Sequence, residues 1–231
     1  MNYMQLASNL YAIPLDGVNA FLIDSDELIL IDTGIPDSAE KILSVVHQIN
    51  RKPEELQHIL VTHCHPDHAG SLAELKRLTG ASAYMHPIDA VVSRVGIIPE
   101  LKLKATPGME EMFDRFIGNG GAVYEGAEIE YEVNDGEELP LAGGMRAIHV
   151  PGHSAGQLAF LWEKHKGVLF AADTSSNMMG LNYHLGYEDY ELGKESLRQI
   201  TTLNFEVACF GHGDAILKDA SSQFRKKWGR E

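Results

Sequence analysis

The segment that most constrains this chain is 63–68, His-Cys-His-Pro-Asp-His, which holds four potential metal ligands within six residues. It follows a short apolar run and precedes a helical pattern. In an extended segment, residues two apart project from the same face, so His63 and His65 are expected to point together. Asp67 and His68 lie in the turn that begins the helix and can reach a second point nearby. Because histidines this close together are costly to bury without a cation, the spacing predicts a site for two metal ions.

The ligand types in this cluster favour zinc. Imidazole and carboxylate groups suit Zn²⁺, and the same groups can hold iron or manganese. Three further polar residues, His153, Asp173 and His212, each follow an apolar run that is typical of a strand. Sites on sheet scaffolds are built at such positions, so we expect these three side chains to supply the remaining ligands.

Charge and cysteine content limit the classes of partner. The 231 residues include 19 Lys and Arg against 33 Asp and Glu, which gives a formal charge of −14. A field of this sign repels phosphate backbones and anionic membranes, so we expect a small-molecule substrate, no nucleic acid and no membrane partner. Two cysteines, Cys64 and Cys209, cannot build a disulfide framework and fit a reducing compartment. With no leader-like pattern at the N-terminus, we expect a cytoplasmic protein that is a monomer or a homodimer.

The order of apolar patterns predicts the fold class. Two runs of strands are each followed by helices, which favours a four-layer αββα sandwich of the α/β (α+β) class, formed by residues 1–231 as a single domain. Expected strands of the first run lie at 5–13, 19–31 and 58–61, with helices at 37–50 and 70–79. Expected strands of the second run lie at 129–133, 145–150, 156–162, 167–171 and 206–210, with helices at 190–203 and 218–229.

Two irregular segments, 87–120 and 174–190, interrupt this pattern and are expected to act as a lid or as substrate loops. An alternative for the first is a helical insertion that covers a sheet edge. The second contains Met178, Tyr183 and His184, which we expect to contact the substrate, within an apolar and adaptable pocket. An alternative is that the apolar side chains are ordinary core beneath a loop.

Five motifs, in order along the chain, resemble those of the metallo-β-lactamase superfamily. They are Asp32-Thr33-Gly34, the H-x-H-x-D-H signature at 63–68, Pro151-Gly152-His153, the strand-terminal Asp173, and Gly211-His212-Gly213. The resemblance covers about residues 8 to 215. It implies that Asp32 orients ligands rather than binding metal. The implied ligands are His63, His65 and His153 for the first metal, Asp67, His68 and His212 for the second, and Asp173 as a bridge.

The resemblance also implies a hydrolytic mechanism. Two cations that share a water lower its pKa from 15.7 to about 7, and the resulting hydroxide attacks a carbonyl carbon. Asp67 and Asp173 are the catalytic residues of this scheme. Asp67 accepts a hydrogen bond from the hydroxide and shuttles its proton, while Asp173 bridges the cations.

Within the family, the resemblance favours a glyoxalase-II-like or lactonase-like hydrolase that cleaves an ester, thioester or lactone. Asp173 at the bridging position argues against a true β-lactamase. Only residues 213–231 follow His212, a segment too short for the helical domain of glyoxalase II, and Ser176 stands where quorum-signal lactonases typically have a tyrosine. A persulfide-type dioxygenase with a single iron, and a non-catalytic metal-binding module, stay open as alternatives.

Overall fold

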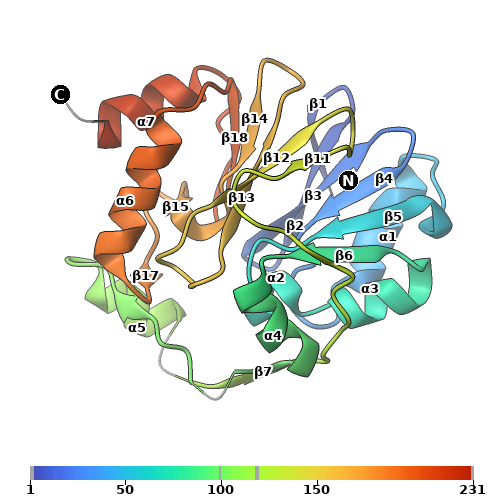
Figure 1. Cartoon of the computed structure of the whole chain (residues 1–231), viewed down its shortest axis with the longest axis horizontal. Coiled ribbons are helices and arrows are strands. Elements are labelled where there is room, and N and C mark those ends of the chain that lie inside the picture. The colour runs from blue at the N-terminus through green and yellow to red at the C-terminus, as the bar shows by residue number, and fades with distance from the viewer. Residues whose placement is uncertain (1–2, 99, 118–119, 230–231) are drawn as a thin grey trace.

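The structure is a computed structural model that describes residues 3–98, 100–117 and 120–229. Two β-sheets pack face to face and helices cover both outer faces, so the expected αββα sandwich is confirmed (Figure 1). Pro99, Gly118 and Asn119, which belong to the first irregular segment, lie outside the described residues.

The first half of the chain forms a seven-stranded sheet in the order β1-β2-β3-β4-β5-β6-β10. Strands β1 to β4 are antiparallel, and β4, β5 and β6 run parallel. The strands are β1 Met4–Ala7, β2 Leu10–Leu15, β3 Val18–Asp24, β4 Leu28–Ile31, β5 Leu56–Leu60, β6 Ser82–Met85 and β10 Tyr131–Glu132. The helical elements are α1 Ala39–Gln48, the 3₁₀ turn η1 Pro53–Glu55, α2 Pro66–Ala69 and α3 Leu72–Thr79.

The second half forms a five-stranded sheet in the order β11-β12-β13-β14-β18. Its strands are β11 Glu138–Leu139, β12 Met145–His149, β13 Leu158–Trp162, β14 Val168–Phe170 and β18 Val207–Cys209. The helical elements are the 3₁₀ turn η2 Ala172–Thr174, α6 Tyr190–Thr201 and α7 Ala220–Trp228. Helices α6 and α7 cover the outer face of this sheet, and α1 and α3 cover that of the first (Figure 1).

Alternation along the strands divides the apolar side chains into three layers. In β3, Leu22 packs toward α1 and α3, whereas Ile23 faces the second sheet. In β13, Phe160 faces the first sheet and Leu161 packs toward α6 and α7. Successive side chains of a strand point to opposite faces, so strands that are apolar on both faces are what a four-layer sandwich requires.

The irregular segments contain short elements at one end of the sandwich. The first segment holds α4 Pro87–Val95, β7 Ile97–Ile98, β8 Lys104–Ala105 and α5 Glu110–Phe116, and β9 Ala122–Val123 follows it. The second holds β15 Ser175–Ser176, β16 Asn182–Tyr183 and β17 Gly186–Tyr187. Strand β8 pairs with β17, so the two segments are joined to each other.

One expected strand belongs to the other sheet. The strand expected at 129–133 as part of the second run forms only β10, which pairs parallel with β6 in the first sheet. Next to β10, the Glu130 carboxylate accepts a hydrogen bond from the backbone N–H of Ala83 in β6, which helps to hold this connection against the first sheet. Among the helices that the structure describes, none combines the length and apolar character needed to cross a bilayer.

Candidate metal centre

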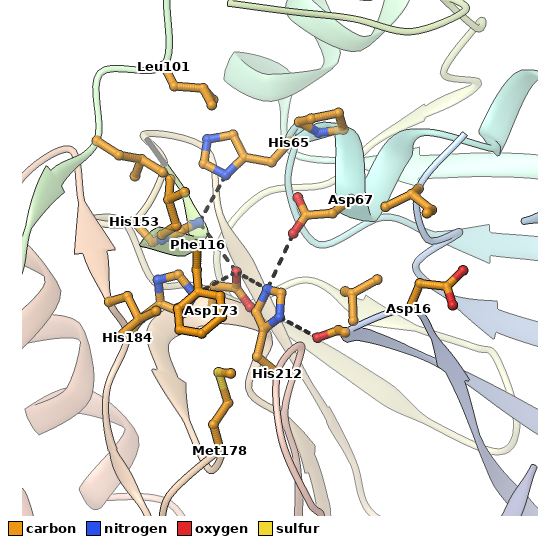
Figure 2. A pocket seen from close by; sticks show the side chains of 17 residues that line it. Asp16, His65, Asp67, Leu101, Phe116, His153, Asp173, Met178, His184 and His212 are labelled. Carbon is orange, nitrogen blue, oxygen red and sulfur yellow. Dashed lines mark hydrogen bonds and ion pairs between the residues drawn. The ribbon is translucent and has the colours of Figure 1, made fainter. Parts of the chain in front are cut away.

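The residues predicted to bind metal meet at one edge of the sandwich, where loops leave strands of both sheets. Figure 2 shows side chains from these loops pointing toward one another around Asp173. The loop after β5 and helix α2 carry His63, His65, Asp67 and His68; the segments after β12, β14 and β18 carry His153, Asp173 and His212.

Pro66 sets the local geometry of the first of these loops. A residue before proline is pushed toward extended backbone, and His65 has φ −65° and ψ 149°. Pro66 then begins α2, because proline fits the first turn of a helix. His63 and His65 therefore project from non-helical backbone, while Asp67 and His68 project from the first helical turn.

Three buried imidazoles form the first cluster. Nε2 of His63 lies 3.1 Å from Nδ1 of His65, and this Nδ1 lies 2.9 Å from Nε2 of His153. Tetrahedral ligands at zinc distances of about 2.0–2.1 Å lie about 3.3 Å from one another. The three nitrogens thus have nearly the spacing of ligands around a common cation.

Two carboxylates and two imidazoles form the second cluster. Oδ2 of Asp173 lies 3.3 Å from Nε2 of His68 and 3.2 Å from Nε2 of His212. Oδ2 of Asp67 lies 3.3 Å from the same nitrogen of His212. Because Oδ2 of Asp173 also lies 3.4 Å from Nε2 of His153, its carboxylate stands between the two clusters.

Two buried atoms of the second cluster have no hydrogen-bond partner within the described part of the chain. They are Nε2 of His68 and Oδ1 of Asp173. A buried polar atom is normally paired, and leaving one unpaired costs about 1–3 kcal/mol. A cation would satisfy both atoms. The donor set, three imidazoles in one cluster and two imidazoles with two carboxylates in the other, therefore fits two divalent cations.

The first cluster is electrically neutral in the metal-free protein. Burial lowers the pKa of His63 well below its usual value, because no water solvates an imidazolium there. Burial likewise lowers the pKa of His65 to about 4 and that of His153 to about 3. All three imidazoles are unprotonated at neutral pH, as cation binding requires.

The second cluster holds protons instead. Burial again opposes the imidazolium, but the Asp173 and Asp67 carboxylates outweigh it and raise the pKa of His212 to about 10. The same carboxylates raise the pKa of His68 well above its usual value, against the effect of burial. A cation that enters this cluster must therefore displace protons.

Asp32 orients the second cluster from behind. It accepts hydrogen bonds from the backbone N–H of Thr62 at 2.8 Å and from its hydroxyl at 2.9 Å. It also accepts from Nδ1 of His68 at 2.8 Å, which leaves Nε2 of that ring facing the cluster. Such contacts fix the tautomer and direction of a ligand, which is the role that the resemblance implies for Asp32.

Backbone carbonyls orient two further rings. Nδ1 of His153 donates to the carbonyl of Gly186 at 2.8 Å, and Nδ1 of His212 donates to the carbonyl of Gly17 at 2.8 Å. In both rings Nε2 is thereby left free for the clusters.

A cavity of about 560 Å³ opens beside the two clusters (Figure 2). A volume of this size suits a ligand of drug-like dimensions. Neither lysine nor arginine occurs among the described residues that line it. Its apolar walls are formed by Val18, Ile35, Leu101, Leu103, Phe116, Ile117, Met178 and Leu185.

The three residues expected to contact the substrate lie in different places. Met178 and His184 line the cavity, whereas Tyr183 is not among the lining residues and packs against the ring of Trp228. His184 is buried, and its Nε2 lies 3.4 Å from Oδ2 of Asp173, so this side chain is part of the site.

Sequence reasoning did not single out the cavity residues that the first irregular segment supplies. A signal was present at 101–104, where leucine and lysine alternate. Leu101 and Leu103 face the cavity, while Lys102 and Lys104 are exposed. Alternation of this kind indicates an extended segment with one apolar face.

Known proteins resemble this chain over most of its length. The family model described as "Metallo-beta-lactamase superfamily" matches residues 13–212. The curated protein "Thioesterase pkgB" of Emericella nidulans is 28% identical over 214 residues, which cover 92% of this chain and 50% of that protein. "Atrochrysone carboxyl ACP thioesterase" of Aspergillus fumigatus is 27% identical over 213 residues, which cover 90% of this chain and 40% of that protein. The chain thus spans half or less of the length of these two relatives.

A solved structure shares the fold. The crystal structure of MEM-A1, a subclass B3 metallo-beta-lactamase isolated from a soil metagenome library, superposes with a TM-score of 0.74. The two sequences are 24% identical, and the superposed region covers 99% of this chain and 93% of the other. At this identity the likeness establishes the architecture alone.

Proposed function

Because this chain belongs to the metallo-beta-lactamase superfamily, we propose that it is a hydrolase that uses two divalent cations, with zinc as the first choice, to cleave a thioester, ester or lactone of an uncharged small molecule. The observation that carries the proposal is the Asp173 carboxylate between the two clusters. Its Oδ2 lies 3.4 Å from a nitrogen of the first cluster and 3.2 and 3.3 Å from nitrogens of the second.

The two clusters differ in the protons that they must release when a cation binds. When bound, two such cations lower the pKa of a shared water to about 7 and polarise the substrate carbonyl. The neutral first cluster binds without releasing protons, whereas the second releases them. The proposed ligands are His63, His65 and His153 for one cation and Asp67, His68 and His212 for the other, with Asp173 shared.

Asp67 is suited to move protons. Its side chain is 34% exposed, whereas Asp173, which also lines the cavity, is buried. Oδ2 of Asp67 faces His212, and we assign Oδ1 the role of accepting the proton of the attacking water and returning it to the leaving group. General acid–base transfer of this kind contributes about 10²–10⁴-fold to the rate.

His184 gives the site a polar group that faces the substrate. Burial lowers its pKa to about 3, so the imidazole is neutral at working pH. A neutral imidazole donates or accepts a hydrogen bond according to its tautomer. Its position beside Asp173, on the wall of the cavity, suits contact with the carbonyl or leaving group of a bound substrate.

The walls of the cavity favour an uncharged acyl group. Eight apolar side chains besides Pro66 line it, and neither a lysine nor an arginine within the described residues balances an anionic substrate there. Asp16 and Asp67 add negative charge to the lining and disfavour a carboxylate further. The names of the two fungal relatives, both thioesterases, support a thioester as the first substrate class to test.

A second candidate is oxygen chemistry at a single iron. His153, Asp173 and His184 form a group of two histidines and one carboxylate whose ligand atoms lie within 4.8 Å of one another. This is the ligand set of many non-haem iron oxygenases. The identity of the native metal separates the two candidates.

The test is elemental analysis of protein purified without added metal or chelator, followed by turnover assays. The substrate panel pairs thioesters, esters and lactones that have neutral acyl groups with analogues that carry a carboxylate. Two zinc ions per chain and faster turnover of the neutral member of each pair would support the proposal. One iron per chain, with oxygen consumed and no hydrolysis, would replace it with the second candidate. The Asp173→Asn variant is the matched control for contaminating hydrolases.

A further inference from the structure

A buried carboxylate outside the ligand set, Asp89, joins two of the loops that form the first cluster. It lies in α4, within the first irregular segment, and is 2% exposed. Its Oδ2 accepts hydrogen bonds from the N–H of Cys64 at 3.0 Å and from the hydroxyl of Ser154 at 2.9 Å. Its Oδ1 accepts from the N–H of Gly156 at 2.8 Å. One side chain thus ties the loop after β5 to the loop after β12.

The donors stand beside the histidines of the first cluster. Cys64 lies between His63 and His65, and Ser154 directly follows His153. Side chains on extended backbone project in directions that the backbone fixes. Holding the N–H of Cys64 therefore fixes the direction of both neighbouring imidazoles.

The carbonyl of Cys64 is held as well. It accepts a hydrogen bond from the hydroxyl of Tyr124 at 2.8 Å, and this hydroxyl lies 3.1 Å from Oγ of Ser93 in α4. The packing around Asp89 is close, since a Cβ atom added at Gly156 would lie 2.3 Å from its Oδ1. Both backbone polar groups of Cys64 are thus bound by side chains, Asp89 in α4 and Tyr124, whose hydroxyl contacts Ser93 of α4.

The role of Ser154 follows from the same contact. Residues 152–156, Gly-His-Ser-Ala-Gly, have the spacing of the Gly-x-Ser-x-Gly motif of serine hydrolases. Ser154 is 2% exposed and its hydroxyl donates to Asp89, so it is not presented to the cavity as a nucleophile. In this protein the serine of the motif holds the loop after β12 against Asp89.

We propose that Asp89 is a positioning residue that sets the cation affinity of the first cluster and couples that cluster to α4. The inference rests on the proposed metal centre. The side-chain hydrogen bonds recorded for Asp89 reach the loops of the first cluster, whereas those of Asp32 reach Thr62 and His68. Through the Thr62 hydroxyl, which lies 3.0 Å from Nδ1 of His63, Asp32 also reaches the first cluster, whereas the contacts of Asp89 go to the loops of the first cluster alone.

Asp89→Asn tests this role because asparagine has nearly the same volume and only one acceptor oxygen. In either orientation its amide NH₂ faces a backbone N–H, of Cys64 or of Gly156. Zinc titration of metal-free protein against a competing chelator should show one of two binding constants weakened by about 10–100-fold, with the other unchanged. Hydrogen exchange of the Cys64 amide should accelerate in the metal-free variant. Asp114→Asn, an exposed change in α5, is the matched control and should alter neither readout.

The outcomes separate this inference from the proposed function. A wild-type protein that binds no zinc would refute the metal centre, and with it the affinity part of the inference. Wild-type binding of two zinc ions, with both constants unchanged in Asp89→Asn, would overturn the role of Asp89 alone, as would equal weakening of both constants. Should Asp89→Asn fail to fold, Ser154→Ala removes one donor, leaves the carboxylate in place, and should weaken the same constant by a smaller factor.

Discussion

Oδ2 of Asp32 lies 2.8 Å from Nδ1 of His68, and the opposite nitrogen of that ring, Nε2, faces Asp173 at 3.3 Å. Asp32 has a left-handed backbone with φ 60°, and its N–H donates to the carbonyl of Leu60 at the end of β5. A residue that touches no predicted cation thereby determines which nitrogen of a ligand faces the site.

Replacing Asp32 with asparagine should weaken the second cluster more than the first, which Asp32 reaches only through the Thr62 hydroxyl, 3.0 Å from Nδ1 of His63. An amide has one acceptor oxygen, while Asp32 accepts three hydrogen bonds, two of them from Thr62. We expect the affinity for the second zinc to fall about 10–100-fold. Stepwise zinc titration against a chelator measures both constants, and a variant that binds two ions as tightly as wild type would contradict this role.

Replacing Asp173 with asparagine should abolish hydrolysis and lower the cation content from two per chain. The change removes the charge that both clusters share while keeping the side-chain volume. Burial alone would raise the pKa of Asp173, but His212 and His68 hold it well below its usual range, so the wild-type carboxylate is ionised. Elemental analysis and turnover assays test the outcome, and circular dichroism checks that the fold is kept. Retained activity would refute the two-cation mechanism.

Lowering the pH should release the cation of the second cluster first. His212, with a pKa of about 10, and His68, with a raised pKa, bind protons that compete with the cation, so affinity falls by about tenfold per pH unit for each proton displaced. His65 and His153, with pKa values of about 4 and 3, are neutral down to pH 5, so no proton competes with a cation at these two residues in that range. Dialysis at pH 8, 7, 6 and 5 followed by elemental analysis should pass through a state with one cation per chain. Simultaneous loss of both would be inconsistent with these protonation states.

Truncating Phe116 to alanine should weaken substrate binding without slowing the chemical step. Phe116 lines the cavity and is 61% exposed, so it contributes apolar contact and is not among the proposed ligands. Loss of that contact costs about 1 kcal/mol, or about fivefold in KM, for a substrate with an apolar acyl group. Steady-state kinetics with a long and a short acyl group measure the effect, which should be smaller for the short one. Val123→Ala, which changes an exposed side chain outside the cavity, should leave both values unaltered.

The parts of the site that the sequence predicts are those governed by local rules. Pro66 forces extended backbone before it and helix after it, so the directions of the neighbouring histidines follow from the sequence. Residues such as Asp173 and His212 come directly after apolar strands. The glycine before His212, in contrast, is required by a contact with a residue distant in sequence. A Cβ at Gly211 would lie 2.1 Å from Oδ1 of Asp173.

The parts that the sequence does not predict depend on tertiary contacts. In the sequence, Asp89 has no feature that separates it from other polar residues of a helix. Its role depends on hydrogen bonds from backbone N–H groups that are distant in sequence, which no local pattern predicts. Tyr183 lies in an irregular segment, where no periodicity fixes the direction of a side chain, and it packs toward α7. The sheet that β10 joins is decided by pairing with β6, which a two-residue strand does not reveal.

The division of the ligands between the two sheets has a consequence for the order in which the protein matures. Four of the seven proposed ligands lie within residues 63–68 next to the first sheet, and the other three come from loops of the second. A chain whose first sheet alone has folded offers no complete cluster, because each cluster takes ligands from both sheets. In the proposed two-cation scheme, cation binding therefore follows the docking of the two sheets, and the bound ions add their binding free energy to the folded state across that interface. In that scheme metal loading is a late step, which separates chains whose two sheets have docked from chains whose sheets have not.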